Sequence, residues 1–587
     1  MGPSRAPSLP ASTILVLGLA RLSTVLAHGD DGHEHNGSSD HMDDPQDDYP
    51  PSYFSHPDHA GLMYGHISVM VIAWVFVLPV AVMLSLVRSR YTLASQFIFT
   101  AANALGILLG TIYNAQTPDL YPGNAHHSIG WIVTWVTIAH VLVSLMGRVA
   151  GAVKASYRGS TQEQHHFIPV STEMGGDHGH HRFGPGYRLS EDSGQGSEPA
   201  SESFRGNSVS THVADEEEDI SLALSRQSKE YGEDGLDLES MPFSNLRRRS
   251  ALAQKCARAI SGRFWKYVTV GYKIVDRIIL PLGFVAVTTG VVTYGRFFEG
   301  RGIFNGLAHW IKGGIFFWLG LFNLGRWTGS FAELGWAWNI RPKQPRRKWR
   351  PSAEFVESAL IFAYGSTNIF LEHLGNWGGR WTSSDLEHVS ITVLFIGGGL
   401  CGMLIESTWI RELLNANISD ITATDSYSDL EKEQLRPPTT YEFSLNPIPA
   451  LVILLLGIMM GSHHQQTMTS TMVHKQWGNL FLGASLARGL TYVVMYIRPP
   501  RSILPSRPPT ELLTAFGLIA GGIIFMASSK GTVDGMIHHD LEAMFIYTVT
   551  MGLVGILMAW VVAVLAIKGW ALRKERRAGR LHLGQPS

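Results

Sequence analysis

The chain has 587 residues, of which 45% are hydrophobic and only 16% charged, and its formal net charge is −1. This near-neutral balance lacks the basic surplus of a protein that binds phosphate backbones, so we expect no nucleic-acid partner. The two cysteines, Cys256 beside a polar stretch and Cys401 inside an apolar run, exclude a disulfide framework.

The N-terminus has the pattern of a cleaved signal peptide over residues 1–27. Arg5 precedes the apolar stretch ILVLGLA, and Val25-Leu26-Ala27 offers a small-residue cleavage site. An uncleaved anchor helix is the alternative, and either form leads the chain into the secretory pathway. Residues 28–62 then form a lumenal tail rich in His and Asp.

Eleven apolar segments of about the length needed to cross a bilayer follow the signal. They predict an all-α fold, a polytopic bundle of membrane helices whose first partner is the lipid bilayer. The segments lie near 63–87, 93–115, 128–150, 269–293, 304–327, 354–372, 389–410, 447–463, 474–497, 511–528 and 541–567.

Basic clusters give the bundle an orientation. RSR at 88–90, RPKQPRRKWR at 341–350 and RKERR at 573–577 all fall on one side of the predicted topology, which the positive-inside rule assigns to the cytosol. We therefore expect a lumenal N-terminus and a cytosolic C-terminus, in the secretory and endomembrane system or the plasma membrane. The other, lumenal side receives 17 of the 25 histidines, which points to a metal, haem or proton site there.

Composition divides the membrane part in two. Residues 63–150 hold three helices, and 266–572 hold the larger C-terminal membrane domain, followed by a basic cytosolic tail at 573–587. The stretch 151–265 between them is poor in apolar residues and rich in Ser, Glu, Asp and Gly. Such a composition cannot bury enough surface to offset its ordering entropy, so it predicts a disordered cytosolic linker.

Two histidines near the lumenal ends of the first and third helices are candidate haem ligands. His66 and His127 sit at similar depths on helices that run in the same direction, and paired imidazoles can fill both axial positions of a b-type haem. The surrounding pattern, a His followed by Met, Trp, Pro and a final Arg, resembles the cytochrome b561 family. That resemblance implies a lumenal haem b on this pair. It also implies a second, cytosolic pair on the second and fourth helices, which carry no histidine here, so a two-haem relay is not expected. Interfacial histidines without a cofactor are the alternative.

Histidines and carboxylates also gather at the lumenal ends of the later helices. Mixed imidazole and carboxylate ligands suit zinc, iron or manganese, so we expect a divalent metal site, with a hydrogen-bonded polar cap as the alternative. The candidate ligands are Glu372, His373, Asp385, His388, His463, His464, His474, His538 and His539.

A few ionisable residues fall inside the apolar runs. Glu406 and Arg488 each lie toward the cytosolic half of a helix and are expected to form a structural ion pair, since unpaired intramembrane charges are costly. A transport path lined by Lys312, Glu406 and Arg488 is the alternative. His309 can join the lumenal cluster, and His140 is left unassigned as a satisfied polar contact.

The run FNGLAHWIKGGIFFWLGLFNLGRW, with EHLGNW, HHQQTMTSTMVHKQWGNLF and MIHHDLEAM, is similar to a fungal family of multi-pass membrane proteins. Its members combine an N-terminal domain of unknown function with a long C-terminal domain described as similar to mitochondrial electron-transport proteins. The C-terminal half also resembles the animal transmembrane protein 45-like family. The resemblance implies a membrane location, and with the histidines it favours lumenal redox or metal handling. The sequence lacks a flavin or nicotinamide fingerprint, so the electron donor or acceptor is an unidentified outside partner. A metal or proton transporter and a non-catalytic scaffold remain alternatives.

Overall fold

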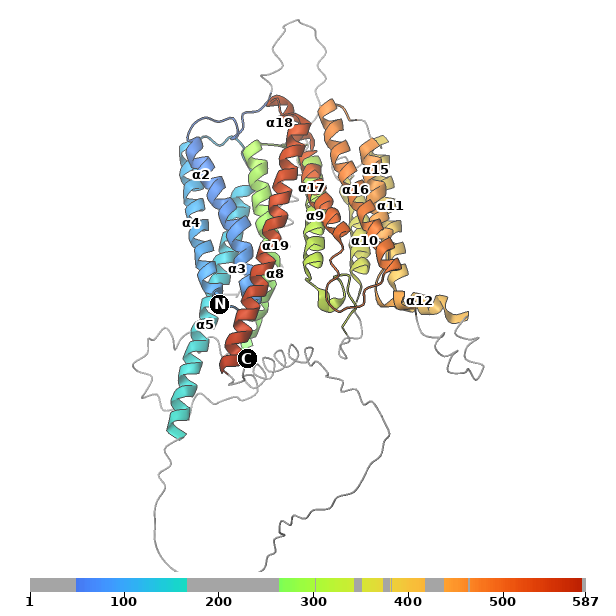
Figure 1. The fold of residues 1–587 in the computed structure, drawn as a ribbon. Helices are drawn as coiled ribbons and strands as arrows, with labels where there is room; N and C mark the ends of the chain where they lie inside the picture. The colour runs from blue at the N-terminus through green and yellow to red at the C-terminus, as the bar shows by residue number, and fades with distance from the viewer. Residues whose placement is uncertain are drawn as a thin grey trace, which may run out of the picture.

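The computed structural model describes residues 49–165, 263–300, 302–342, 351–372, 381, 383–417, 438–462 and 465–582. Every regular element in these ranges is a helix, and each of the eleven predicted segments contains one, so the all-α prediction is confirmed. The long helices run side by side along a common direction (Figure 1). They are α2–η1–α3 (Ala60–Val71, Ile72–Val77, Leu78–Leu86), α4 (Thr92–Gln116), α5 (His126–His165), α8 (Arg263–Gly295), α9 (Gly302–Thr328), α10 (Ala353–Glu372), α11 (Ser383–Glu406), α15 (Ile448–Ser462), α16 (Met468–Ile497), α17 (Pro509–Ala527) and α19 (Ala543–His582).

Eight of these helices are long and apolar enough to cross a membrane. Large apolar side chains such as Ile132, Trp135 and Ile556 point outward and are more than half exposed, as lipid-facing residues are. Within a helix every backbone hydrogen bond is made inside the segment, which is why helices suit the bilayer. The chain is therefore an integral membrane protein.

We call the two ends of the bundle the histidine end and the basic end. The histidine end, at the top of Figure 1, is where α2, α5, α9 and α16 begin, and it includes the short helix α18 (Lys530–His538). The basic end, at the bottom, is where α3 and α19 finish and where the short helix α12 (Thr408–Leu414) lies. Two 3-10 turns, η4 (Ala332–Leu334) and η6 (Thr439–Glu442), belong to the connections near the basic end.

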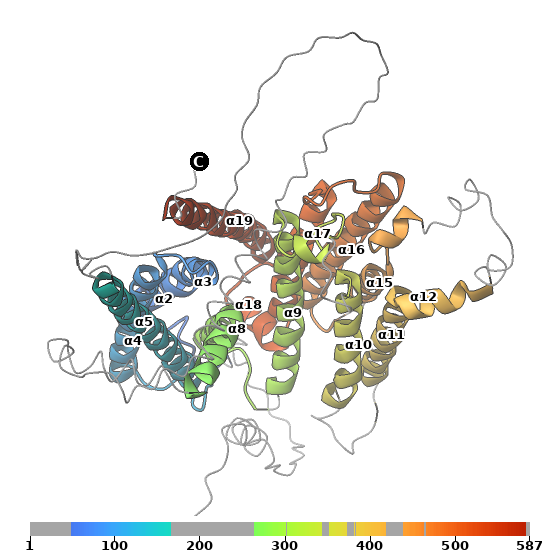
Figure 2. The ribbon, with the colours of Figure 1, turned by 90° about the horizontal axis from the view of Figure 1, so that it is seen from below.

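The helices form two packed groups with α19 between them (Figure 2). The first bundle contains α2–η1–α3, α4, α5 and α8, and its core includes Trp74, Phe99, Val133 and Ile279. The second group contains α9, α10, α11, α15, α16 and α17 around an aromatic core. Helix α8 thus packs with the helices that precede the predicted linker.

A proline in the first helix helps to attach α19 to the first bundle. Pro79 has no N–H to donate to the carbonyl of Val75 four residues earlier, and the helix widens to a π-turn over Ile72–Val77. Trp560 Nε1 of α19 donates to that carbonyl at 2.9 Å. One backbone irregularity therefore supplies a specific contact between segments almost 500 residues apart.

Two helices extend beyond the segments that the sequence predicts. Helix α5 continues to His165, well into the stretch predicted as a disordered linker from 151, because that stretch begins with helix-compatible residues such as Ala, Val and Lys. Helix α19 likewise continues through most of the predicted tail, where Lys574 donates to the hydroxyl of Tyr91 and Glu575 accepts from Arg90. The predicted signal peptide and the linker beyond residue 165, up to 262, lie outside the described residues.

Candidate site in the first bundle

His66 of α2 packs against Gly106 and Gly110 of α4. Its Nδ1 hydrogen-bonds the carbonyl oxygen of Gly106 at 2.7 Å. One turn further on, a Cβ at Gly110 would stand only 2.7 Å from the same nitrogen. The GxxxG spacing, which lets membrane helices approach closely, here makes room for Met70 at Gly106 and for the imidazole of His66 at Gly110.

His126, the first residue of α5, is seated in the same way against α8. Its Nδ1 lies 3.3 Å from the hydroxyl of Thr289, and a Cβ at Gly290 would come within 3.0 Å of its ring. His66 and His126 thus each rest on a neighbouring helix at a position that a larger residue would fill.

His66 and His126 face each other across the histidine end of the bundle. Their ring centres are 6.4 Å apart and their planes cross at 79°. Nδ1 of each ring contacts its own neighbouring helix, so Nε2 is the nitrogen that each ring has left to bind another group. A second bond that fixes the tautomer in this way is the usual support of a metal-ligating histidine.

The sequence led us to expect that His66 pairs with His127, but the structure does not pair them. His127 is exposed and its ring lies 6.5 Å from Trp131, one turn along the same helix. Adjacent residues on a helix point about 100° apart, so only one of the two can face the core. That one is His126.

The other half of the first bundle contains a second buried polar cluster. His140 Nε2 of α5 lies 2.9 Å from a carboxylate oxygen of Asp276 on α8. Ser85 donates to the second oxygen of Asp276, and the ring of Tyr272 stacks on His140 at 4.1 Å. His140 therefore has a carboxylate and an aromatic neighbour, but the contact of its Nε2 with Asp276 lacks hydrogen-bond geometry.

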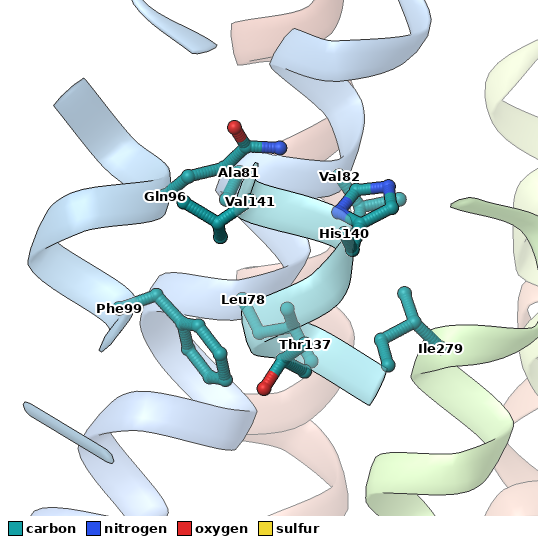
Figure 3. A pocket seen from close by; sticks show the side chains of 9 residues that line it. All are labelled: Leu78, Ala81, Val82, Gln96, Phe99, Thr137, His140, Val141 and Ile279. Carbon is teal, nitrogen blue, oxygen red and sulfur yellow. The ribbon is translucent and has the colours of Figure 1, made fainter. Parts of the chain in front are cut away.

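A small cavity adjoins this cluster (Figure 3). Its volume of about 20 Å³ is enough for one water molecule. Gln96 of α4 lines it together with His140, and the side-chain oxygen of Gln96 is buried without a hydrogen-bond partner. Between this cluster and the imidazole pair, Trp74 packs edge-on against Phe99 and donates to Asn103.

The predicted metal ligands are only partly described. For Glu372 and Asp385 the structure describes only the helix backbone, and His373, His463 and His464 lie outside the described residues. Of the rest, His388 stands on α11 and His474 is buried on α16, whereas His538 stacks on Tyr49 at 4.4 Å beside His539. Among described residues, no three His, Cys, Asp or Glu side chains gather as a metal site would require. The predicted cluster therefore stays a prediction.

The second group is held together by a buried network of charges near the basic end. Arg326 of α9 pairs with Glu354 and Glu357 of α10, each at 2.9 Å. Arg488 of α16 pairs with Glu357 at 3.2 Å and with Glu511 of α17 at 2.8 Å. All five side chains are nearly inaccessible, and Arg326 also lies over the ring of Trp338. Two guanidinium groups and three carboxylates thus link four helices.

The expected ion pair between Glu406 and Arg488 is wrong. Arg488 belongs to the network, whereas Glu406 accepts hydrogen bonds of 2.6 Å from Ser352 and from Ser444. Lys312, the third residue of the alternative transport path, stands on α9 and also has an interaction partner. Glu406 and Arg488 therefore have separate sets of partners.

Several of these residues carried signals in the sequence. The spacing Gly106-xxx-Gly110 on a histidine-free helix marks a close approach of a neighbouring helix. Asp276, Glu357 and Glu511 are charged residues in predicted membrane helices, and such charges need partners. Their partners could not be named without knowing which helices are neighbours.

Comparison with known proteins matches both halves of the chain. A family described as "Protein YTP1-like, C-terminal" matches residues 282–569, and a "Domain of unknown function (DUF2427)" matches residues 47–150. The chain is 33% identical to the "Uncharacterized membrane protein C3B8.06" of Schizosaccharomyces pombe over 516 residues, which are 87% of this chain and 94% of the relative.

Two proteins of Saccharomyces cerevisiae match over shorter ranges. The "Uncharacterized membrane protein YCR061W" is 39% identical over 312 residues, 50% of this chain and 47% of the relative. "Protein YTP1" is 22% identical over 180 residues, 30% of this chain and 31% of the relative. No solved structure matches the chain.

Proposed function

Because the chain belongs to the YTP1-like family of membrane proteins, we propose that it is a membrane-bound electron-transfer protein with one b-type haem held by His66 and His126. The observation that carries the proposal is the geometry of this pair. Two imidazoles of a transmembrane bundle face each other, and each has its Nδ1 bonded to a neighbouring helix. The residue pattern that resembles cytochrome b561 falls on the same helices.

The separation of the two rings suits a shared metal centre. An imidazole nitrogen binds a metal at about 2 Å, so two opposed ligands place their nitrogens about 4 Å apart and their ring centres about 6 Å apart. The observed distance between ring centres is 6.4 Å. Cofactors of helical bundles are bound in this manner, by side chains that project inward from facing helices.

The chain itself orients the ligands and limits access to them. The carbonyl of Gly106 and the hydroxyl of Thr289 hold the two rings in place. The packed side chains of Trp74 and Phe99 lie on the side of the site that faces the middle of the membrane. A haem held by His66 and His126 would supply reversible one-electron transfer. Because both histidines would be occupied in holding the group, electron exchange with an outside partner fits this site better than binding of a small substrate.

The site supports one haem at one side of the membrane. At the depth where a second haem would belong, the bundle is filled by His140, Asp276, Ser85 and Tyr272, which bond to one another. By the positive-inside rule, the basic clusters favour a cytosolic placement of the opposite end. In this proposal the electron therefore enters and leaves on the lumenal face, to and from partners that the chain does not contain.

The test is a reduced-minus-oxidised absorption spectrum of the purified full-length protein. We expect the bands of a b-type haem in the wild type, and their loss in His66→Ala and in His126→Ala. His127→Ala is the matched control, since it removes a neighbouring but exposed imidazole and should leave the spectrum unchanged.

Three outcomes would overturn the proposal or its ligands. A wild-type spectrum without haem bands removes the haem and leaves the scaffold or transport alternatives. Bands that survive in His126→Ala but vanish in His127→Ala restore the pairing expected from the sequence. Bands that survive in His66→Ala exclude the pair altogether.

A further inference from the structure

Basic side chains from three separate segments gather at the basic end of the first bundle. The segments are the turn between α3 and α4 (residues 87–91), the middle of α5 and the last turns of α19. We call this the basic surface, and its residues are Arg88, Arg90, Arg148, Arg573, Lys574 and Arg577. Glu575 is the only acidic residue within 84–92, 144–149 and 568–578, so positive charge is in strong excess.

Hydrogen bonds hold the three segments together. Glu575 of α19 accepts from the hydroxyl of Ser89 at 3.2 Å and from the backbone N–H of Arg90 at 3.1 Å. Arg148 of α5 donates to the carbonyl oxygen of Ser89 at 2.8 Å. The turn is thus bonded on one side to α5 and on the other to α19, and the charges belong to one folded surface instead of separate tails.

An aromatic pair forms part of the basic surface. The rings of Tyr91 and Trp570 stack with their centres 5.8 Å apart, and Trp570 is about half exposed. Lys574 donates to the Tyr91 hydroxyl at 2.6 Å, and its ammonium lies 5.0 Å from the centre of each ring. Tyr and Trp are enriched where a membrane meets water, so this pair indicates the level of the lipid headgroups.

The length of α19 supports the same depth. The helix has 40 residues and begins at the histidine end. At about 1.5 Å per residue it is about twice as long as the roughly 30 Å hydrocarbon core. Its last turns therefore extend past the acyl chains at the basic end (Figure 1). Trp570, Arg573, Lys574 and Arg577 follow the spacing that places residues on one face of a helix.

Three arginines of the basic surface keep their charge available. Glu575 pairs with Arg90 at 3.4 Å. Among the described residues, none forms an ion pair with Arg88, Arg573 or Arg577, and all three are exposed. A guanidinium group offers a planar set of N–H donors that matches the oxygens of a phosphate. The surface therefore fits a phosphate group at headgroup depth.

We propose that the basic surface binds the headgroup of an anionic phospholipid, with Arg88, Arg573 and Arg577 contacting its phosphate and Trp570 beside its glycerol region. The positive-inside rule favours a cytosolic placement of this end, and the cytosolic leaflet is rich in anionic lipids. A headgroup bound there contacts both α19 and the α3–α4 turn, so it strengthens the attachment of α19 to the first bundle. No histidine takes part, and the site does not depend on the haem pair.

The experiment is a titration of the delipidated full-length protein in detergent with phosphatidylserine, followed by native mass spectrometry. The wild type should bind this lipid more tightly than phosphatidylcholine, and its thermal unfolding temperature should rise on binding. The variant that combines Arg88→Gln, Arg573→Gln and Arg577→Gln should bind it at least tenfold more weakly, since each basic residue at a membrane surface contributes about fivefold.

The matched control combines Arg498→Gln, Arg501→Gln and Arg507→Gln. These arginines are exposed near the basic end of the second group, and the change in net charge is the same. Arg507 also has a positive φ, as Arg88 does. Phosphatidylserine should bind to this variant within about twofold of the wild type, because the residues of the basic surface are intact.

Four outcomes would overturn the proposal. Equal losses in the two triple variants would show that net charge, and not this surface, attracts the lipid. Equal affinity of the wild type for phosphatidylcholine would remove the preference for an anionic headgroup. Displacement of phosphatidylserine by an equal concentration of inorganic phosphate would assign the site to a free anion.

The fourth outcome needs no variant and guards against misfolding. Salt screens exposed charges, so the affinity of the wild type for phosphatidylserine should fall as salt is added, and an affinity that salt leaves unchanged contradicts the proposal. A wild-type protein without haem bands leaves all of these expectations in place. The lipid site and the haem site therefore fail separately.

Discussion

The two groups of helices handle buried polar side chains in different ways. In the first bundle, His66 and His126 each have one ring nitrogen bonded to a neighbouring helix, and the two rings meet edge to face. In the network of the second group, both guanidinium groups bind carboxylates directly, and the four helices are joined through those bonds. The first arrangement leaves ligand atoms to spare, whereas the second uses its charges for cohesion. Buried polar residues in a membrane protein therefore point to a binding site only when some of their hydrogen-bonding atoms are not used in bonds to neighbouring helices.

The largest expected effect is on the network of the second group. Arg488→Met removes a guanidinium and leaves Glu357 and Glu511 buried with fewer partners. Breaking a buried ion pair in this way costs about 3–5 kcal/mol. We expect a marked fall in the thermal unfolding temperature of the purified protein, measured by intrinsic fluorescence.

Arg498→Met provides the comparison, because Arg498 is an exposed arginine at the end of the same helix. Such a surface change is expected to stay within about 0.5 kcal/mol. Equal unfolding temperatures for the two variants would show that the network does not hold the second group together.

The next prediction concerns the contact of His66 with Gly110, and the change is expected to affect haem binding more than stability. Gly110→Ala places a methyl group 2.7 Å from the imidazole nitrogen in its present position, so the ring must move. We expect b-type absorbance per protein to fall severalfold, while the stability falls by only about 1–3 kcal/mol. Gly130→Ala is the control, because a Cβ at Gly130 meets no atom within 4 Å.

If Gly110→Ala keeps the wild-type spectrum, the contact with Gly110 does not position His66 to bind a haem. In that case the contrast between the two groups loses its main support. If Gly130→Ala loses the bands as well, the absorbance reports a general sensitivity of the bundle instead of this contact.

The helices and their order could be predicted from the sequence because apolar runs of membrane length are a strong signal. The choice between His126 and His127 could not. It depends on how α5 is rotated about its axis, and that rotation is fixed by contacts with Thr289 and Gly290, which come more than 160 residues later.

The ion network was missed for a related reason. Glu354 and Glu511 stand in the first turns of α10 and α17, where acidic residues are common because they complement the helix dipole. That ordinary explanation hid their second role. Glu406 and Arg488 were paired from their similar depth alone, whereas pairing depends on which helices are neighbours.

The smallest expected effect lies outside the membrane, where the segment before α2 connects the two groups at the histidine end. Phe54 N–H donates to the carbonyl of Tyr294 at the end of α8, and the Phe54 ring lies 4.7 Å from His539, which follows α18. Burial, and secondarily the neighbouring His538, lower the pKa of His539 below its ordinary value. The docked state therefore disfavours a charged His539.

The sign of the pH dependence follows from this shift. Because the docked pKa lies below the ordinary value of about 6.5, the contact is fully stable above that pH and weakens as the pH falls toward the docked pKa, where the released state takes up the proton more readily. We expect hydrogen exchange of the Phe54 amide, corrected for its intrinsic rate, to be faster at pH 5 than at pH 7.5. His539→Phe retains a ring against Phe54 and removes the titrating group, so its exchange should not change with pH. The other charged groups near this contact are Asp534 and Lys530 of α18 and Arg296 after α8, and burial raises the pKa of Asp534. If His539→Phe keeps the wild-type dependence, Asp534 is the group that titrates, and the connection between the two groups does not depend on the imidazole.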